Sequence, residues 1–173
     1  MRERTITVNG FSKGFAMTGW RLGYAAAAAP VARAIAKVQG TFSAGANAFV
    51  QRAAITALAG DRSDVEQMRL SYLRRRDLMI GCLDAMPGIK APTPKGAFYM
   101  FADMSACLGK TAGNRHIATA ADLADWLLEK HLVATVPGSA FGNPNCIRLS
   151  FAASDDNIRT GLERMANGLA ELE

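Results

Sequence analysis

The order of apolar and polar positions predicts a long helix in the middle of the chain. Between Asp64 and Met86, apolar residues recur three or four positions apart, which places them on one face of a helix. This apolar stripe consists of Val65, Met68, Tyr72, Met79, Cys82, Leu83 and Met86. At 1.5 Å per residue the helix would be roughly 34 Å long, enough to bridge two domains. Ser63 and Glu66 have the spacing of a capping box at its start, and Pro87 helps to end it.

Four further helices are expected from similar spacing and from residues that favour helix ends. They span residues 31–38, 48–59, 120–131 and 155–172. Pro30 precedes the first helix, Gly60 follows the second, and Ser154 has the side chain of an N-cap before the last.

Strands are expected in short segments where β-branched, aromatic and alternating apolar residues gather. The segments are residues 5–8, 24–27, 96–101, 132–136 and 146–151. In the last of them, alternation places Ile147 and Leu149 on one face and Arg148 on the opposite face. Residues 41–47 and 114–119 are rich in small or polar side chains, so we expect loops there.

Composition indicates a globular protein of one domain, or one and a half. Of the 173 residues, 50% are hydrophobic and 20% are charged. No stretch approaches the length of a membrane span, and the first residues lead into a short strand rather than into the apolar run of a signal peptide. The three cysteines have unrelated spacings, and His116 and His131 lack the spacing of metal ligands. We therefore expect a cytoplasmic protein with no bound metal and no membrane partner.

The net charge of +5 raises the question of a nucleic-acid partner. The densest basic run, Arg74-Arg75-Arg76, falls in the long helix beside Asp77, as expected of a solvated helix face. No aromatic residues are interleaved with it. The sequence therefore indicates no nucleic-acid binding.

Residues 9–24 carry the candidate chemistry of the chain. Lys13 lies among aromatic and other apolar residues, so we expect its amine to lie beside apolar surface, which favours the neutral form that attacks carbonyl groups. Arg21 offers a planar and permanently charged fork that suits a phosphate. Gly19 and Gly23 are expected to let the backbone turn tightly between them. Pyridoxal phosphate has both an aldehyde and a phosphate, and it would use both Lys13 and Arg21.

A family resemblance is strongest from Ser12 to Tyr24. The segment Ser-Lys-Gly-Phe-Ala-Met-Thr-Gly-Trp-Arg-Leu-Gly-Tyr closely resembles the cofactor-lysine segment of class I/II aminotransferases, which are pyridoxal-phosphate enzymes of fold type I. The resemblance implies that Lys13 bonds to the aldehyde of pyridoxal 5'-phosphate and moves a proton between substrate and cofactor. It implies that Arg21 binds the phosphate, with Ser12 as a second contact. The implied activity is amino-group transfer between an amino acid and a 2-oxo acid, in a homodimer.

Three later segments resemble the same family. They are Pro-Lys-Gly-Ala-Phe-Tyr at 94–99, Val-Pro-Gly-Ser-Ala-Phe-Gly at 136–142 and Ile-Arg-Leu-Ser at 147–150. By this resemblance, Arg148 binds the α-carboxylate of the substrate through a bidentate pair. Such a pair would orient the amino acid for reaction.

The implied fold is α/β, the end of the fold type I large domain followed by a smaller α+β carboxyl-terminal domain. We assign residues 1–60 to a remnant of the large cofactor-binding domain, 61–86 to an interdomain helix and 87–173 to the small carboxyl-terminal domain. All of the matches belong to the carboxyl-terminal part of an aminotransferase, and the upstream part supplies the family's partner for the pyridine nitrogen. We therefore expect a truncated aminotransferase that is inactive alone.

Two alternatives stay open. Aminotransferase-like domains also occur in transcription regulators, where they bind the cofactor as a sensor. In addition, Gly10-x-Ser12-x-Gly14 matches the nucleophile elbow of serine hydrolases, with residues 6–8 as the preceding strand. The hydrolase hypothesis leaves residues 17–24 without an explanation.

Overall fold

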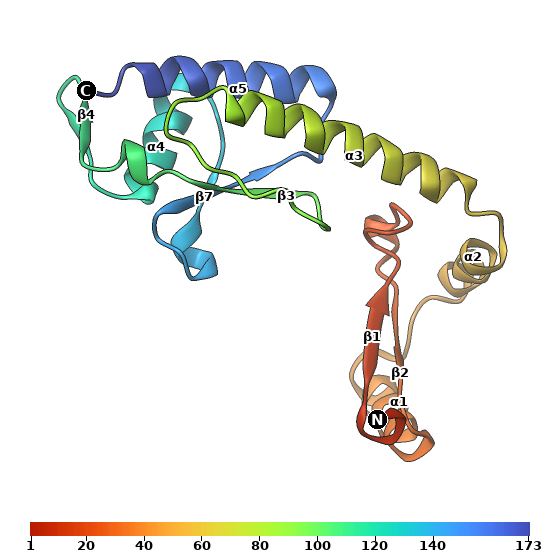
Figure 1. Ribbon diagram of the computed structural model, residues 1–173. Coiled ribbons are helices and arrows are strands. Elements are labelled where there is room, and N and C mark those ends of the chain that lie inside the picture. The colour runs from red at the N-terminus through yellow and green to blue at the C-terminus, as the bar shows by residue number, and fades with distance from the viewer. The chain divides into compact units, whose positions relative to one another are not determined.

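The computed structural model describes all 173 residues, which form an α/β fold with two compact units, Met1–Met68 and Arg69–Glu173 (Figure 1). The α-helices are α1 (Ala29–Ser43), α2 (Ala48–Ala59), α3 (Ser63–Asp84), α4 (Ala120–His131) and α5 (Asp155–Ala170). The strands are β1 (Thr7–Gly10), β2 (Gly23–Ala26), β3 (Tyr99–Asp103), β4 (Lys110–Ala112), β5 (Arg115–Ile117), β6 (Val136–Pro137) and β7 (Cys146–Ser150). Four short 3-10 segments are η1 (Arg2–Arg4), η2 (Thr18–Trp20), η3 (Ser105–Cys107) and η4 (Gly138–Phe141).

The first unit is built from a two-stranded sheet and two helices. β1 and β2 pair antiparallel, with Gly10 opposite Gly23 at one end. The Asn47 side chain caps α2 by accepting a hydrogen bond from the Phe49 backbone N–H at 3.1 Å. The buried hydrophobic residues of this unit are Phe11, Val50 and Ala54. Both strands are exposed along their whole length.

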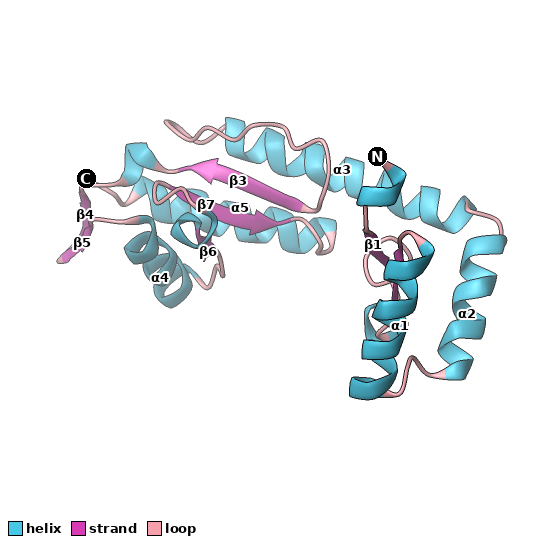
Figure 2. Cartoon of the chain, turned by 90° about the horizontal axis from the view of Figure 1, so that it is seen from below, coloured by secondary structure: helices cyan, strands magenta, loops and turns pink.

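The second unit has a hydrophobic core against one face of a three-stranded antiparallel sheet, in the order β3-β7-β6 (Figure 2). Ile147 and Leu149 of the central strand are buried, as the alternation predicted, and Arg148 is only half-buried. The core residues with no exposed area include Leu83, Met100, Ala102, Met104, Ile117, Leu123, Leu127, Ile147 and Met165. They come from α3, α4, α5 and the sheet with its loops, so these elements close over the same face.

The long helix was predicted correctly in its extent and apolar face. Met79 and Leu83 are buried, and Tyr72 and Cys82 pack against the core. The predicted capping box is wrong, because Ser63 is the first residue inside α3 rather than the residue before it.

The start of α3 is held by Asp61. Its carboxylate accepts a hydrogen bond from the Ser63 backbone N–H at 3.1 Å. Hydrogen bonds from the Ser63 side chain and backbone lower the pKa of Asp61. A carboxylate at the amino end of a helix also interacts favourably with the helix dipole.

The basic run on α3 lies at the surface, where Arg74 is exposed, but it also has a structural role that the sequence did not indicate. The carboxylate of Asp155 accepts hydrogen bonds from Arg74 Nε at 3.0 Å and from Arg75 Nε at 3.2 Å. These bonds tie α3 to the first residue of α5, and the two helices lie side by side in Figure 1. Ser154 caps α5 as predicted, accepting a hydrogen bond from the Asn157 backbone N–H at 3.2 Å.

The predicted loop at 114–119 is wrong, because β4 and β5 pair there as an antiparallel hairpin. Gly113 makes the turn with a φ of 61°. Thr111 also exchanges two backbone hydrogen bonds with Glu173, each 3.0 Å long. The hairpin is therefore completed by a residue more than sixty positions away, which local sequence does not indicate.

Several predicted boundaries shift. α1 continues to Ser43, through part of the predicted loop at 41–47. The strand expected at 132–136 is reduced to Val136–Pro137, because Leu132 adopts a left-handed conformation (φ 57°) that ends α4. The strand expected at 96–101 begins only at Tyr99.

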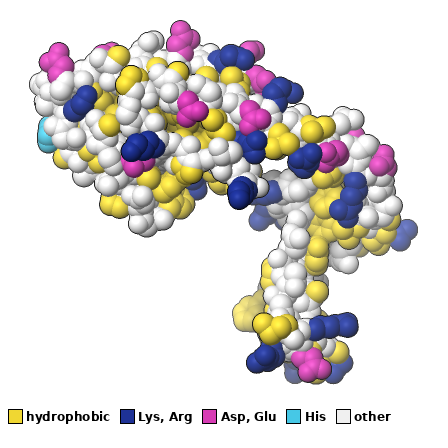
Figure 3. Space-filling view, viewed as in Figure 1, with side chains coloured by type: hydrophobic (Ala, Val, Ile, Leu, Met, Phe, Trp, Pro, Cys, Tyr) yellow, Lys and Arg dark blue, Asp and Glu magenta, His cyan; other side chains and the backbone are white.

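On the face of the second unit that Figure 3 shows, acidic and basic side chains are mixed. None of the five α-helices is both long and apolar enough to span a membrane. The chain also holds no group of three or more His, Cys, Asp or Glu side chains that could bind a metal.

The three cysteines are free thiols, and burial raises the pKa of Cys107 and Cys146.

Candidate functional site

Lys13 lies in the segment that joins β1 to β2 in the first unit. The strands lead into this segment at the Gly10–Gly23 pair, and the Phe11 backbone N–H continues the pairing by donating to the Leu22 carbonyl at 3.2 Å. Phe11 is buried and anchors the start of the segment. Its ring centroid lies 5.4 Å from that of Phe15 and 5.9 Å from that of Tyr24. This aromatic cluster fixes the residues on either side of Lys13.

Hydrogen bonds within this segment involve each of the three predicted cofactor residues. Thr18 Oγ1 donates to the Ser12 carbonyl at 2.9 Å, and Arg21 Nη1 donates to the Thr18 carbonyl at 3.0 Å. The Ala16 backbone N–H donates to the Lys13 carbonyl at 3.3 Å. Thr18 therefore links Ser12 to Arg21, while the Ala16 bond closes a separate turn at Lys13.

The loop contains two residues in the left-handed conformation, which L-residues other than glycine seldom adopt. They are Ala16, with a φ of 54°, and Arg21, with a φ of 53°. Such residues cost roughly 1–3 kcal/mol each and cluster at functional sites. The tight turn that we expected from Gly19 is instead made by Arg21, since Gly19 does not have a positive φ.

Gly23 is needed for a close approach between the strands. A Cβ added there would lie 2.9 Å from the Asn9 carbonyl oxygen on the partner strand. The absence of a side chain thus brings β1 and β2 together at the point where the Lys13 loop begins.

Lys13 lines an open cavity of about 330 Å³ on this loop. The other lining residues are Asn9, Gly10, Ser12, Gly14, Phe15 and Tyr24. Lys13 itself is exposed, which contradicts our expectation that its amine lies against apolar surface. An amine, a serine hydroxyl and aromatic rings at one small cavity suit an aromatic aldehyde, whereas Arg21, the predicted phosphate ligand, does not line this cavity.

The serine-hydrolase alternative lacks its structural context. A nucleophile elbow places its serine on a sharp turn between a strand and a helix. β1 precedes Ser12 as required, but no helix follows it, and the next regular element is the 3-10 segment η2. The glycine-serine pattern at residues 10–14 therefore does not form an elbow here.

Arg148 lies in the second unit, on the central strand of the sheet and on the face away from the core. It pairs with Phe101 of β3 and with Val136 of β6. Its guanidinium carbon lies 4.3 Å from the ring centroid of Tyr99 and 4.3 Å from that of Phe141. No acidic side chain of the chain pairs with Arg148, and its cation contacts the two aromatic rings.

Sequence reasoning missed Tyr99 and Phe141 as neighbours of Arg148. Tyr99 pairs with Ser150, one diagonal step from Arg148, so its contact depends on the register of β3 and β7. Phe141 comes from η4, the segment before β7. The only sequence signal was that both aromatics fall in segments that resemble aminotransferases.

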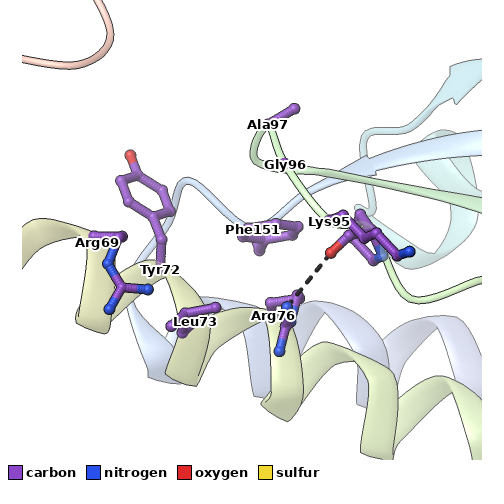
Figure 4. A pocket seen from close by; sticks show the side chains of 9 residues that line it. Arg69, Tyr72, Leu73, Arg76, Lys95, Gly96, Ala97 and Phe151 are labelled. Carbon is purple, nitrogen blue, oxygen red and sulfur yellow. Dashed lines mark hydrogen bonds between the residues drawn. The ribbon is translucent and has the colours of Figure 1, made fainter.

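A second cavity, of about 310 Å³, lies on α3 in the second unit (Figure 4). Its lining includes Tyr72, Arg76, Lys95 and Phe151. Arg76 is already engaged, because Nε and Nη2 bind Asp77 and Nη1 donates to the Pro94 carbonyl at 3.4 Å. No residue that the sequence predicted for the site lines this cavity.

Comparison with known proteins places all of these residues inside one family match. The family model described as aminotransferase class I and II matches residues 1–165. The chain is 44% identical to an aspartate aminotransferase of Pinus pinaster over 173 residues, which is 98% of this chain and 35% of that protein. It is 41% identical to an aspartate aminotransferase of Rhizobium meliloti over 96% of this chain and 41% of that protein.

Solved structures of aminotransferases are also similar to this chain. The crystal structure of the aspartate aminotransferase from Rhizobium meliloti superposes with a TM-score of 0.96 at 39% identity, over 99% of this chain and 43% of that one. The aromatic aminotransferase from Pyrococcus horikoshii superposes with a TM-score of 0.87 at 41% identity, over 99% of this chain and 44% of that one. The chain thus spans less than half the length of these relatives.

Proposed function

Because the chain belongs to the class I and II aminotransferase family, we propose that it forms part of a pyridoxal-phosphate-dependent enzyme that transfers an amino group between an amino acid and a 2-oxo acid. The observation that carries this proposal is the family match over residues 1–165, which contains the Lys13 loop and the Arg148 strand. The relatives that share these residues are named aminotransferases.

Lys13 is the proposed catalytic residue. Its exposed amine on the cavity surface is able to bond to the cofactor aldehyde and, once released, to carry a proton to or from the substrate carbon. When bound, pyridoxal phosphate supplies an electron sink for the substrate carbanion. The loop contributes by fixing the backbone from which the side chain extends, since the Ala16 N–H donates to the Lys13 carbonyl and buried Phe11 anchors the start of the loop.

Arg21 and Ser12 are proposed to hold the cofactor phosphate. Arg21 uses only one guanidinium nitrogen within the chain, for the Thr18 carbonyl, so its remaining N–H groups are free to donate to an anion. Ser12 has a hydroxyl on the cavity surface beside Lys13. A charge-assisted contact of this kind both strengthens cofactor binding and orients the ring relative to Lys13.

Arg148 is proposed to bind the α-carboxylate of the amino acid. Its donors have no partner within the chain, and a guanidinium edge matches a carboxylate in a bidentate pair. Because relatives are named aspartate aminotransferases, we propose an acidic amino acid such as aspartate as the donor. We further propose a cytoplasmic homodimer as the working form.

Reductive trapping tests the proposed cofactor site. The purified chain is incubated with pyridoxal phosphate and reduced with borohydride, and modified lysines are mapped by mass spectrometry. We expect selective labelling of Lys13, its loss in Lys13→Ala, and labelling as in the wild type in Lys37→Ala, which removes an exposed lysine of the same unit.

The Arg21→Ala variant tests the phosphate contact in the same assay. Loss of a hydrogen bond to a charged group should weaken the apparent affinity for the cofactor about tenfold or more. Labelling that spreads evenly over the exposed lysines of the wild-type chain would refute the assignment of Lys13.

A further inference from the structure

Arg148 is flanked by two aromatic rings that come from different parts of the second unit. Tyr99 is the first residue of β3, and Phe141 is the last residue of η4. Each ring centroid lies 4.3 Å from the guanidinium carbon. The Phe141 ring is itself supported edge-on by Phe101, at 6.3 Å and 90°. A guanidinium that contacts two rings at this distance has less freedom to move than one exposed to solvent alone.

The edge of the same guanidinium has no partner. Arg148 makes no hydrogen bond or ion pair within the chain, although Arg74, Arg75, Arg76 and Arg115 each bind a carboxylate. Arg148 is also half-buried, so its N–H groups are only partly solvated. A cation that contacts aromatic rings and keeps its N–H groups without a partner in the chain is able to donate them to a carboxylate.

We propose that Tyr99 and Phe141 are positioning residues that restrict the movement of the Arg148 guanidinium and so prepare it to bind a carboxylate. This inference rests on the proposed function, in which Arg148 binds the α-carboxylate of the substrate. In this role the rings act through Arg148 and not on the ligand directly. They act by ordering the arginine before the ligand arrives, so that binding does not have to immobilise it.

The expected effect follows from the cost of ordering a long side chain. Immobilising one flexible side chain on binding corresponds to about a two- to tenfold loss of affinity. Removing either ring should therefore weaken carboxylate binding by about that factor. Removing the tyrosine hydroxyl alone should change the affinity for the carboxylate little, because the ring that contacts Arg148 remains.

The experiment measures maleate, a dicarboxylate without an amino group, binding to the purified chain. The titration is followed by the NMR signals of the Arg148 Nε–H group and of the backbone amides of β7. The ring-removing variants are Tyr99→Leu and Phe141→Leu, and the matched ring-keeping controls are Tyr99→Phe and Phe141→Tyr. Phe141 is 49% exposed, so an added hydroxyl has access to water. Arg148→Lys keeps the charge and removes the planar fork.

The predicted result is weaker binding in both leucine variants and in Arg148→Lys, with near wild-type binding in both ring-keeping variants. If Arg148→Lys weakens binding and the leucine variants do not, the positioning role is wrong and the proposed role of Arg148 stands. If maleate leaves Arg148 unaffected in the wild-type chain, or if Arg148→Lys binds equally well, the carboxylate role fails and the positioning role fails with it. In an Arg148→Lys background, the leucine substitutions should have no further effect.

Discussion

Gly138 lies at the tightest point of the turn that leads from β6 to β7, and its replacement by alanine should unfold the second unit at a lower temperature. Gly138 is buried. A Cβ added there would lie 2.4 Å from the Asn143 carbonyl oxygen and 2.5 Å from the Cys146 carbonyl oxygen. Since the optimum separation between non-bonded carbon atoms is about 3.5–4.0 Å, each contact is short by about 1 Å.

The obstacles are backbone atoms that cannot move aside as a flexible side chain would. The Asn143 backbone N–H donates to the Gly138 carbonyl at 3.1 Å, and the Cys146 backbone N–H donates to the Asn143 carbonyl at 3.3 Å. Relieving the overlap would break these bonds at the start of β7. Overpacking of this kind typically costs about 1–3 kcal/mol, and we expect the upper end of that range because both contacts are affected.

Thermal unfolding followed by circular dichroism provides the assay for Gly138→Ala. A loss of about 3 kcal/mol should lower the Tm by about 12–24 °C in a unit of this size. Gly161→Ala is the matched control, because Gly161 lies within α5 with open space around it. Alanine is preferred over glycine within a helix by about 1 kcal/mol, so the control should raise the Tm. A Gly138→Ala variant that melts with the wild-type chain would refute the steric argument.

Two further predictions concern the stability of the second unit. Leu83→Ala should reduce the free energy of unfolding in urea by about 2–5 kcal/mol, because Leu83 has no exposed area, whereas Leu70→Ala at a 52% exposed position should have little effect. Hydrogen bonds from Arg74 and Arg75 hold the pKa of Asp155 below its usual value. The ionised carboxylate therefore contributes to the free energy of unfolding. This contribution is complete above the unfolded pKa of about 3.9 and is lost as pH falls through the lower folded pKa. Acid titrations of stability should therefore be less steep for Asp155→Asn than for the wild type, and identical curves would contradict the assignment.

The sequence predicted features that are encoded locally. The spacing of apolar residues identified α3 and its buried face, because a helix brings together residues three and four apart. Alternation identified the core-facing side of β7 and left Arg148 on the other side. The motif from Ser12 to Tyr24 identified a loop in which Ser12 and Arg21 are joined through Thr18.

The features that sequence reasoning missed depend on contacts between distant residues. The β4–β5 hairpin is completed by Glu173, and the basic run on α3 finds its partner in Asp155. The left-handed conformation of Arg21 could not be predicted from the sequence, because the residue at this position is not a glycine. The conformation is found only in the folded loop, whose ends are joined by β1 and β2. Tyr99 meets Arg148 only because β3 and β7 pair in one particular register.

The two proposed chemical roles differ in how rigid a support they need. Lys13 lies in an exposed loop, and a covalent bond to a cofactor would itself fix the position of the amine. Arg148 would hold a ligand by charge and hydrogen bonds without a covalent bond, so ordering of its side chain by the scaffold beforehand favours binding. The central strand of a sheet with a buried core, together with Tyr99 and Phe141, provides that support. Substitutions that loosen this sheet should therefore weaken carboxylate binding while leaving the trapping of Lys13 unchanged, because the Lys13 loop depends on contacts of its own around Phe11.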